Sequence, residues 1–359
     1  MANTNVNSLL LYCRSGFEKD LASEIQDKAA QLGVYGFAKI TPDSGYVVFQ
    51  CYQDGEGEQL AKQLIFSSLI FARQMFATME VLNELDTNDR LSPIVSACAA
   101  FPLCGDVRVE YADTTEGREL SKFCRKISVP LRQKLRKMHK LTDKEQSNKP
   151  VLHVFFTATD SAFVGYSYSN NNSPLPLGIL RLKMPSDAPS RSTLKLDEAF
   201  QTFIPKSEQA ERLRGSTHAV DLGACPGGWT YQLVKRSMFV YAVDNGAMDK
   251  ALMDSGLVTY CPEDGFKFKA KKPIYWLVCD MIEQPQKVAR LMAQWVASKR
   301  CKEAMFNLKL PMKKRYESVQ ESLAIIDDEI KLQNAGQYAL QVKHLYHNRE
   351  EVTVHLRLI

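Results

Sequence analysis

The sequence of 359 residues lacks the features that mark membrane, secreted and zinc-binding proteins. No apolar run is long enough to span a bilayer, and the polar start Met1–Ser8 offers no apolar signal core. The nine cysteines form no Cys-x-x-Cys pair, and several lie in apolar, strand-like runs where cysteine acts as a small hydrophobic residue. We therefore expect a cytoplasmic protein with reduced cysteines, no metal site and no membrane contact.

A strong excess of charge is also lacking, because the net charge is only +5. Residues 1–150 balance 19 Lys and Arg against 19 Asp and Glu. Within them, one stretch holds eight cations and no acidic residue between them: Lys122, Arg125, Lys126, Arg132, Lys134, Arg136, Lys137 and Lys140. Such a run is usually a solvated helix face, but uncompensated like charges repel and would be relieved by an anionic partner. The stretch therefore favours contact with a nucleic acid.

The first half of the chain alternates short strands and helices. A strand, a helix and a hairpin give the β-α-β-β opening of a ferredoxin-like module, which we assign to residues 1–60. An amphipathic helix over 58–78 is expected to follow. A second module over 61–170 has expected strands at 107–112, 151–157 and 163–169, and an expected helix over 119–138 interrupted at Pro130. The Asn-, Ser- and Pro-rich residues 171–189 are typical of a linker.

The second half, residues 190–359, alternates strands with helices and so predicts an α/β domain with a mostly parallel sheet. Only residues 346–351 separate the last two expected strands, which is too short for a parallel crossover. One antiparallel strand is therefore expected at one edge of this Rossmann-like sheet. The mild charge and the absence of a coiled-coil pattern favour a monomer.

The strongest local signal is the glycine-rich segment Val220–Trp229, where an apolar strand runs into a tight turn and then a helix. Glycines let the backbone approach a ligand closely, and the helix start offers N–H groups. The spacing matches neither the dinucleotide-binding pattern nor the P-loop pattern. Asp244 ends the next strand, where a carboxylate can accept hydrogen bonds from both ribose hydroxyls of an adenosine. Asp264 follows the next connection and could meet the adenine amino group. These residues predict an adenosyl cofactor.

The segment 221–229 resembles the cofactor motif of the FtsJ-like ribose 2′-O-methyltransferases, with Cys225 where many members carry alanine. Segments 11–19, 165–174, 188–196 and 306–316 extend the resemblance over nearly the whole chain. Within that family the chain looks like the bacterial enzymes that methylate a cytidine ribose in 23S rRNA. The resemblance implies an N-terminal THUMP-type RNA-binding region over 61–170 and S-adenosylmethionine as cofactor. The cofactor-binding residues that it indicates are Ser192, Gly223, Cys225, Pro226, Gly227, Gly228, Asp244, Asp264 and Asp280.

The family's catalytic residues form a Lys-Asp-Lys-Glu tetrad, and this chain carries the four types in that order. Lys195 lies on an expected helix with an apolar stripe, and Asp280 and Lys309 end expected strands. The doubled Glu350 and Glu351 leave the fourth position uncertain by one residue, and we prefer Glu351. A ribose hydroxyl must lose its proton as it attacks, and a lysine can accept it only when its pKa is lowered. We expect Lys309 to be the acceptor and Lys195 to be the second cation that lowers its pKa.

Two other functions remain open from the sequence alone. A base methyltransferase could use the same cofactor pocket, although base chemistry would not need two lysines. A catalytically silent RNA-binding assembly factor is disfavoured by the complete tetrad. His344 and His347 have metal-like spacing but no partner cluster, so an ordinary structural role is expected.

Overall fold

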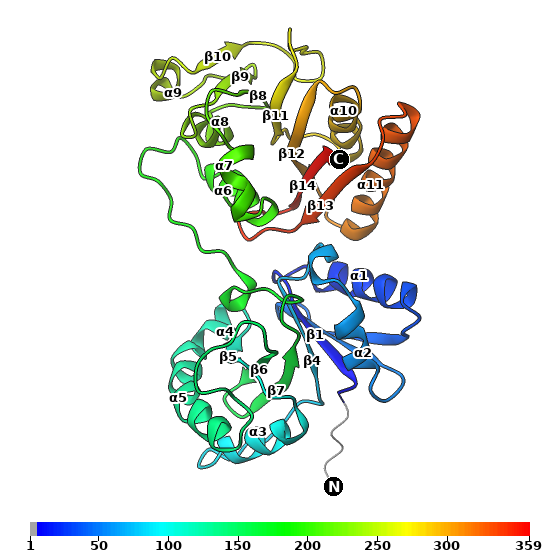
Figure 1. The fold of residues 1–359 in the computed structure, drawn as a ribbon, viewed down its shortest axis with the longest axis vertical. Helices are drawn as coiled ribbons and strands as arrows, with labels where there is room; N and C mark the ends of the chain where they lie inside the picture. Colours follow the sequence, from blue (N-terminus) through cyan, green and yellow to red (C-terminus); the bar gives the residue numbers. More distant parts are fainter. Residues whose placement is uncertain (1–5) are drawn as a thin grey trace. The chain divides into compact units, whose positions relative to one another are not determined.

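The computed structural model describes residues 6–359, so Met1–Asn5 of the polar start lie outside the described part. The chain divides into two compact units, Met1–Ile179 and Leu180–Ile359. Each is built around one sheet (Figure 1), and each sheet has seven strands. Within residues 6–359, no helix combines the length and apolarity needed to cross a bilayer.

The N-terminal unit begins with a ferredoxin-like order of elements. These are β1 (Ser8–Tyr12), α1 (Glu18–Gln31), β2 (Gly36–Ile40), β3 (Tyr46–Cys51), α2 (Glu56–Gln63), a 3-10 turn η1 (Phe66–Ser68) and β4 (Gln74–Thr78). The strands are antiparallel in the order β2-β3-β1-β4, and α1 and α2 pack on them. The helix expected over 58–78 is wrong beyond Gln63, because β4 is a strand buried at all five positions. A strand buried on both faces loses the alternation that distinguishes it from a helix.

The same sheet continues into the second half of this unit. Its elements are α3 (Leu91–Ala97), η2 (Cys98–Ala100), β5 (Asp106–Tyr111), α4 (Thr115–Glu119), α5 (Ser121–Lys137), β6 (Val151–Ala158), β7 (Ser161–Ser167) and η3 (Pro176–Gly178). β7 pairs with β4, so the two expected modules share one sheet. The helical region breaks at Leu120 and not at Pro130, which lies inside α5.

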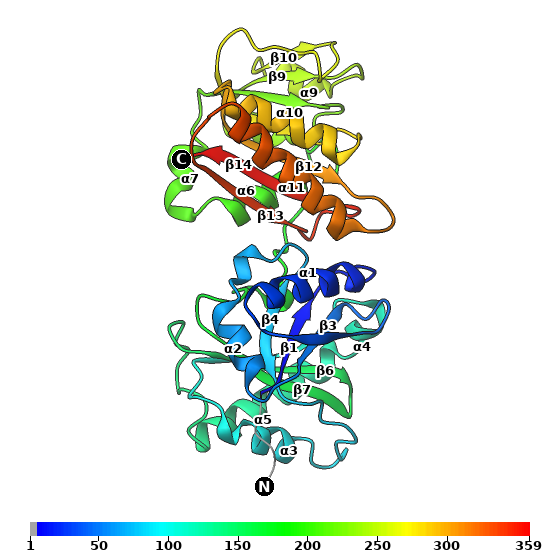
Figure 2. The same cartoon turned by 90° about the vertical axis from the view of Figure 1, so that its right-hand side faces the viewer.

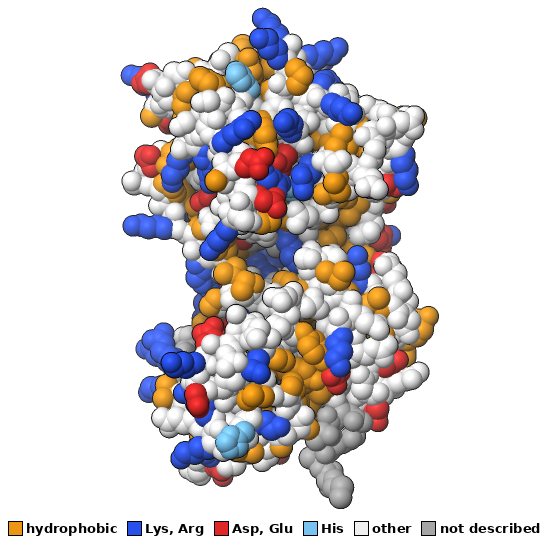
Figure 3. Space-filling view, in the orientation of Figure 1, with side chains coloured by type: hydrophobic (Ala, Val, Ile, Leu, Met, Phe, Trp, Pro, Cys, Tyr) orange, Lys and Arg blue, Asp and Glu red, His pale blue; other side chains and the backbone are white. Residues whose placement is uncertain are grey.

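The basic stretch lies mostly on α5, whose other face buries Cys124, Ile127, Leu131 and Leu135. In Figure 3, Lys and Arg side chains gather on the side of the N-terminal unit where Figure 1 shows α4 and α5. Part of the charge is compensated from elsewhere in the fold, since Arg132 pairs with Asp106 at 2.8 Å. Lys122, Arg125, Lys126 and Lys137 remain exposed.

The first part of the expected linker packs on the N-terminal unit. The side-chain amide of Asn171 donates to the carbonyls of Ala61 at 2.9 Å and Leu64 at 2.8 Å. The N–H of Leu177 donates to the buried carboxylate of Glu110 at 2.6 Å. Residues 171–179 therefore belong to this unit.

The C-terminal unit has helices on both faces of its sheet. Its elements are α6 (Thr193–Phe203), α7 (Lys206–Arg212), β8 (His218–Leu222), α8 (Gly228–Val234), β9 (Phe239–Val243), α9 (Lys250–Asp254), β10 (Val258–Cys261), β11 (Ile274–Cys279), α10 (Pro285–Ala297), β12 (Cys301–Lys309), α11 (Arg315–Leu332), β13 (Tyr338–Lys343) and β14 (Glu351–Leu358). Figure 2 shows α10 and α11 together in front of the sheet, while α6 and α8 pack on the other face.

The strand order is β10-β9-β8-β11-β12-β14-β13. All neighbouring pairs from β10 to β12 are parallel, whereas β14 is antiparallel to both β12 and β13. The last two strands pair antiparallel at one edge of the sheet, as expected. The strand that runs against the others is β14, however, and it lies one position inside the edge, which β13 occupies. Consequently β14 begins at the carboxyl ends of the parallel strands, the edge where α/β sheets carry ligands.

Candidate active site

The glycine-rich turn connects β8 to α8 at the carboxyl edge. Gly223 has a φ of +77° and Gly227 one of +120°, a backbone region that favours glycine. A Cβ on Gly223 would lie 2.6 Å from the side chain of Met281. A Cβ on Gly228 would lie 1.9 Å from the hydroxyl of Ser192. The turn is therefore close-packed, and the predicted residue Ser192 lies against the start of α8.

Asp244 follows β9 and reaches back to this turn. Its carboxylate accepts the N–H of Cys225 at 2.9 Å and that of Gly246 at 2.8 Å. Partial burial and the Asp244 carboxylate raise the pKa of the Cys225 thiol, so this cysteine stays protonated at neutral pH and is a poor nucleophile. Pro226 follows through a cis peptide bond. Asp244 thus fixes the turn between β8 and α8.

Asp264 is an exposed residue in the loop after β10, where its carboxylate accepts the N–H of Phe266 at 2.9 Å. This contact shapes the loop and leaves the other carboxylate oxygen for a ligand. Asp264 therefore lies in the loop after β10, and β10 pairs with β9, the strand that Asp244 follows.

The four tetrad residues form one cluster at the carboxyl edge. Lys195 comes from α6, whose predicted apolar stripe is confirmed by the burial of its leucine, alanine and phenylalanine positions. The Nζ of Lys195 lies 3.1 Å from Asp280 and 2.6 Å from Glu351. The Nζ of Lys309 lies 2.5 Å from each of the same two carboxylates. Two cations and two anions thus alternate in a closed ring.

Of the two adjacent glutamates, the structure brings Glu351 to the lysines. Glu351 starts β14 opposite Lys309 in the strand register, and its side chain is 7% exposed. The side chain of Glu350 is 59% exposed and pairs with Arg315 at 2.7 Å. Successive residues of a strand point to opposite faces, so one residue decides which carboxylate enters the cluster.

The electrostatics of Lys309 differ from the expectation. Burial of its ammonium acts to lower the pKa, but the carboxylates of Asp280 and Glu351 outweigh burial and raise it above the usual value. For Asp280, burial acts to raise the pKa, but Lys309 and Lys195 outweigh it and lower the pKa. The expectation of a lowered pKa at Lys309 is therefore wrong for the free protein, because two anions stand between the two lysines.

Sequence reasoning missed a buried polar network behind the tetrad. The side-chain amide of Asn307 donates to Asp280 at 2.8 Å. Its amide oxygen accepts the hydroxyl of Thr353 at 2.7 Å, and Thr353 also contacts Asn348. Asn307, Thr353 and Asn348 are fully buried. Asn307 lies two residues before Lys309 on β12. A polar residue in the apolar part of this strand was the signal in the sequence that could have indicated the network.

Two buried carboxylates were also missed. Glu198, one turn after Lys195 on α6, accepts the N–H groups of Tyr346 and His347 at 2.8 Å each and so ties α6 to the β13–β14 loop. Asp221 lies under the glycine turn, where burial raises its pKa to about 7. One of its oxygens accepts the hydroxyl of Thr230 at 2.7 Å, and the other has no hydrogen-bond partner among the described residues.

These observations fit an adenosyl cofactor. The close-packed glycine turn offers backbone approach, and Asp244 offers acceptors for ribose hydroxyls. Beneath the turn, Asp221 carries a buried oxygen without a hydrogen-bond partner among the described residues. Among residues 6–359, no group of three His, Cys, Asp or Glu side chains forms a metal-binding cluster.

Comparison with known families covers most of the chain. Residues 6–76 match the model "RlmM ferredoxin-like domain", and residues 89–168 match "Ribosomal RNA large subunit methyltransferase M, N-terminal". Residues 188–309 match "FtsJ-like methyltransferase". The last range contains the glycine turn, Asp244, Asp280 and both tetrad lysines.

Individual relatives extend the similarity over the whole length. The chain is 67% identical over 351 residues to a ribosomal RNA large subunit methyltransferase M of Pseudoalteromonas atlantica, covering 98% of this chain and 99% of that protein. It is 56% identical over 355 residues to the protein of that name from Yersinia pestis, covering 98% and 96%. The solved structure of TrmN from Thermus thermophilus is 14% identical, with a TM-score of 0.37 over 98% of this chain and 99% of that chain. That structural likeness is too low to support an argument.

Proposed function

Because the chain belongs to the ribosomal RNA large subunit methyltransferase M family and is an S-adenosylmethionine-dependent rRNA methyltransferase, we propose that it methylates a ribose 2′-hydroxyl. The target that we propose is a cytidine in 23S rRNA, which follows from the resemblance and not from the geometry. The observation that carries the ribose assignment is the closed ring of Lys195, Asp280, Lys309 and Glu351.

We assign cofactor binding to Ser192, to the turn residues Gly223, Cys225, Pro226, Gly227 and Gly228, and to Asp244, Asp264 and Asp280. When bound, S-adenosylmethionine supplies an electrophilic methyl group on a cationic sulfur. The chain has to hold the attacking hydroxyl in line and to receive its proton. A ring of buried, mutually paired charges is rigid enough to hold an oxygen in one place.

Lys309 is the proton acceptor in this proposal, and its raised pKa sets a condition on the reaction. The neutral amine is the minor form at pH 7, so the reactive fraction grows tenfold with each pH unit below the pKa. Lys195 holds the other oxygens of Asp280 and Glu351, which keeps both carboxylates turned toward Lys309.

Residues 61–170 are, in this proposal, a THUMP-type region that holds rRNA. The exposed cations Lys122, Arg125, Lys126 and Lys137 of α5 support this role, because phosphate contacts dominate RNA affinity. We further propose that the enzyme acts as a monomer in the cytoplasm.

The decisive experiment uses labelled S-adenosylmethionine and two matched RNAs. One is unmodified 23S rRNA, and the other carries 2′-deoxycytidine at the position labelled in the first. A ribose product survives alkaline hydrolysis as a labelled dinucleotide, since a methylated 2′-oxygen cannot attack the phosphate. Labelling of the deoxy RNA would favour a base methyltransferase. Failure to label any rRNA precursor would favour a non-catalytic assembly factor.

A further inference from the structure

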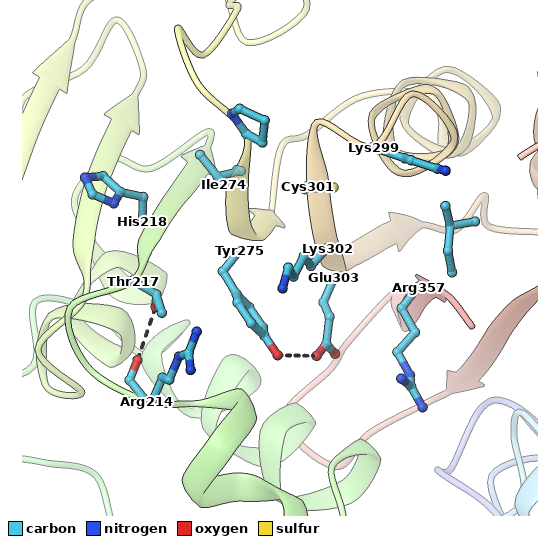
Figure 4. A pocket seen from close by; sticks show the side chains of 12 residues that line it. Arg214, Thr217, His218, Ile274, Tyr275, Lys299, Cys301, Lys302, Glu303 and Arg357 are labelled. Atoms are coloured by element: carbon cyan, nitrogen blue, oxygen red, sulfur yellow. Dashed lines mark hydrogen bonds between the residues drawn. The ribbon is translucent and has the colours of Figure 1, made fainter.

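A pocket of about 590 Å³ opens at the amino edge of the C-terminal sheet, the edge opposite the tetrad. It is formed where β8, β11 and β12 begin and where β14 ends. Its lining includes Arg214, Tyr275, Lys299, Lys302, Glu303 and Arg357. Figure 4 shows Tyr275 and Glu303 in the centre, with Arg214 on one side and Arg357 on the other.

The carboxylate that lines the pocket, Glu303, is neutralised by a buried arginine outside the lining. Arg212, which is buried, donates to the two oxygens of Glu303 at 2.9 and 2.5 Å. Burial acts to raise the pKa of Glu303, but hydrogen bonds from His355 and Arg212 outweigh it and hold the pKa at about 2. Glu303 is therefore ionised at neutral pH, and its carboxylate is occupied by hydrogen bonds from Arg212 and His355.

The cations that line the pocket differ from Glu303 in their pairing. Arg214, Lys299, Lys302 and Arg357 form no ion pair with any residue in the described part of the chain. The ammonium of Lys302 lies over the ring of Tyr275, with its Nζ 5.5 Å from the ring centre. Four cations around one cavity repel one another, and an anion would relieve that repulsion.

The surroundings extend the positive charge and add aromatic faces. The exposed residues Lys271 and Lys272 directly precede Pro273, which lines the pocket. His218 lines the pocket and stacks on the exposed Phe239, with ring centres 5.3 Å apart. Cations beside aromatic faces are the combination that binds the backbone and bases of single-stranded nucleic acid.

We propose that this amino-edge pocket is a second rRNA contact, which holds the phosphodiester backbone of a segment other than the one being methylated. The proposal rests on rRNA being the substrate. The cavity is larger than a single phosphate needs, and its cations come from three stretches of the chain: the α7–β8 loop, the turn into β12 and the end of β14. This spread suits a chain of phosphates. Its role is to anchor the RNA and not to take part in the chemistry.

The test compares two double charge reversals in the full chain. Lys299→Glu with Lys302→Glu changes the pocket, and Lys206→Glu with Lys250→Glu makes the same charge change at exposed sites elsewhere on the unit. Binding to a 23S rRNA transcript is measured across a salt series. We expect the pocket variant to lower the slope of log affinity against log salt by about one per lysine lost. We also expect a roughly tenfold higher KM for rRNA at low salt. The kcat and the cofactor affinity should stay within about twofold, because no pocket residue lies in the tetrad.

A pocket variant that binds rRNA like the control pair would overturn the proposal. So would a pocket that binds ATP or pyrophosphate in wild type, loses it in the variant and leaves rRNA affinity unchanged, because the site would then serve free phosphates. If the charge reversal also weakens cofactor binding, the milder variant Lys299→Gln with Lys302→Gln is measured in its place. A higher KM for rRNA in that variant supports the proposal, and an unchanged KM overturns it. Methyl transfer by wild type in the same assay separates this outcome from failure of the proposed function.

Discussion

The two edges of the C-terminal sheet use charge in opposite ways. At the carboxyl edge, two lysines and two carboxylates are largely buried and pair with one another in a closed ring. At the amino edge, four cations surround an open pocket without ion pairs among the described residues. Paired, buried charges hold each other in one geometry, whereas unpaired, exposed charges are available to a ligand. Changes at the first edge should therefore act on kcat, and changes at the second on RNA affinity.

The largest expected effect comes from removing the proposed proton acceptor. Lys309→Met keeps the length of the side chain but removes its charge and its basic nitrogen. We expect kcat to fall by about 10³-fold, the range of general base catalysis. Cofactor affinity, measured by calorimetry, should change less than about twofold, because Asp280 keeps its hydrogen bonds from Lys195 and Asn307. Lys206→Met is the control. A variant with more than a tenth of wild-type turnover would remove Lys309 from the mechanism.

The next prediction tests the choice between adjacent glutamates. Glu351→Gln should lower kcat by about 100-fold, because Lys195 and Lys309 lose the carboxylate that holds both of them in place. The same change should lower the pKa of Lys309, so the rise of activity with pH should move to lower pH. Glu350→Gln, which loses only an exposed pair with Arg315, should stay within about twofold. Equal effects of the two variants would contradict the assigned register.

The pH dependence of the wild type follows from the sign of the shift at Lys309. Since the pKa is raised above its usual value of 10.5, the neutral amine increases steadily across the neutral range. Log kcat at saturating RNA and cofactor should rise with a slope of about one between roughly pH 6 and 9. A plateau below about pH 8 would show that bound ligands lower this pKa or that another group accepts the proton.

The smallest effect is expected from changes in the buried polar network of Asn307, Thr353 and Asn348, which contacts Asp280. Asn307→Ala removes one of the hydrogen bonds that fix Asp280 and leaves Thr353 short of a partner. We expect about a tenfold loss of kcat and about 1–3 kcal/mol of unfolding free energy, measured by denaturant titration. Thr353→Val should act in the same direction, and Thr353→Ser should restore activity. A loss of stability without a loss of kcat would make the network purely structural.

The comparison also shows which parts of the molecule could be predicted. Asp244 was identified because it follows an expected parallel strand, and such positions share one edge of the sheet. Asp280 and Lys309 were identified by the resemblance to the family's tetrad, which their places at strand ends supported. The helix carrying Lys195 was identified from its apolar spacing, and the structure confirms it. β4 was taken for a helix, because its fully buried positions carry no alternation. The break in the helical region was placed at Pro130 because proline removes an N–H, yet α5 accommodates it.

By itself, the sequence determined the alternation of strands and helices in the C-terminal unit, although not β10, α7 or α9. It also determined the glycine turn and the set of charged residues at strand ends. These are local properties, since a turn or a strand end is written in neighbouring residues. Only the tertiary structure decided that Glu351 and not Glu350 joins the lysines, that two carboxylates raise the pKa of Lys309, and that unpaired cations surround a pocket at the opposite edge. Each of these depends on distances and burial between residues far apart in the chain, and on strand pairing in which one residue selects the face.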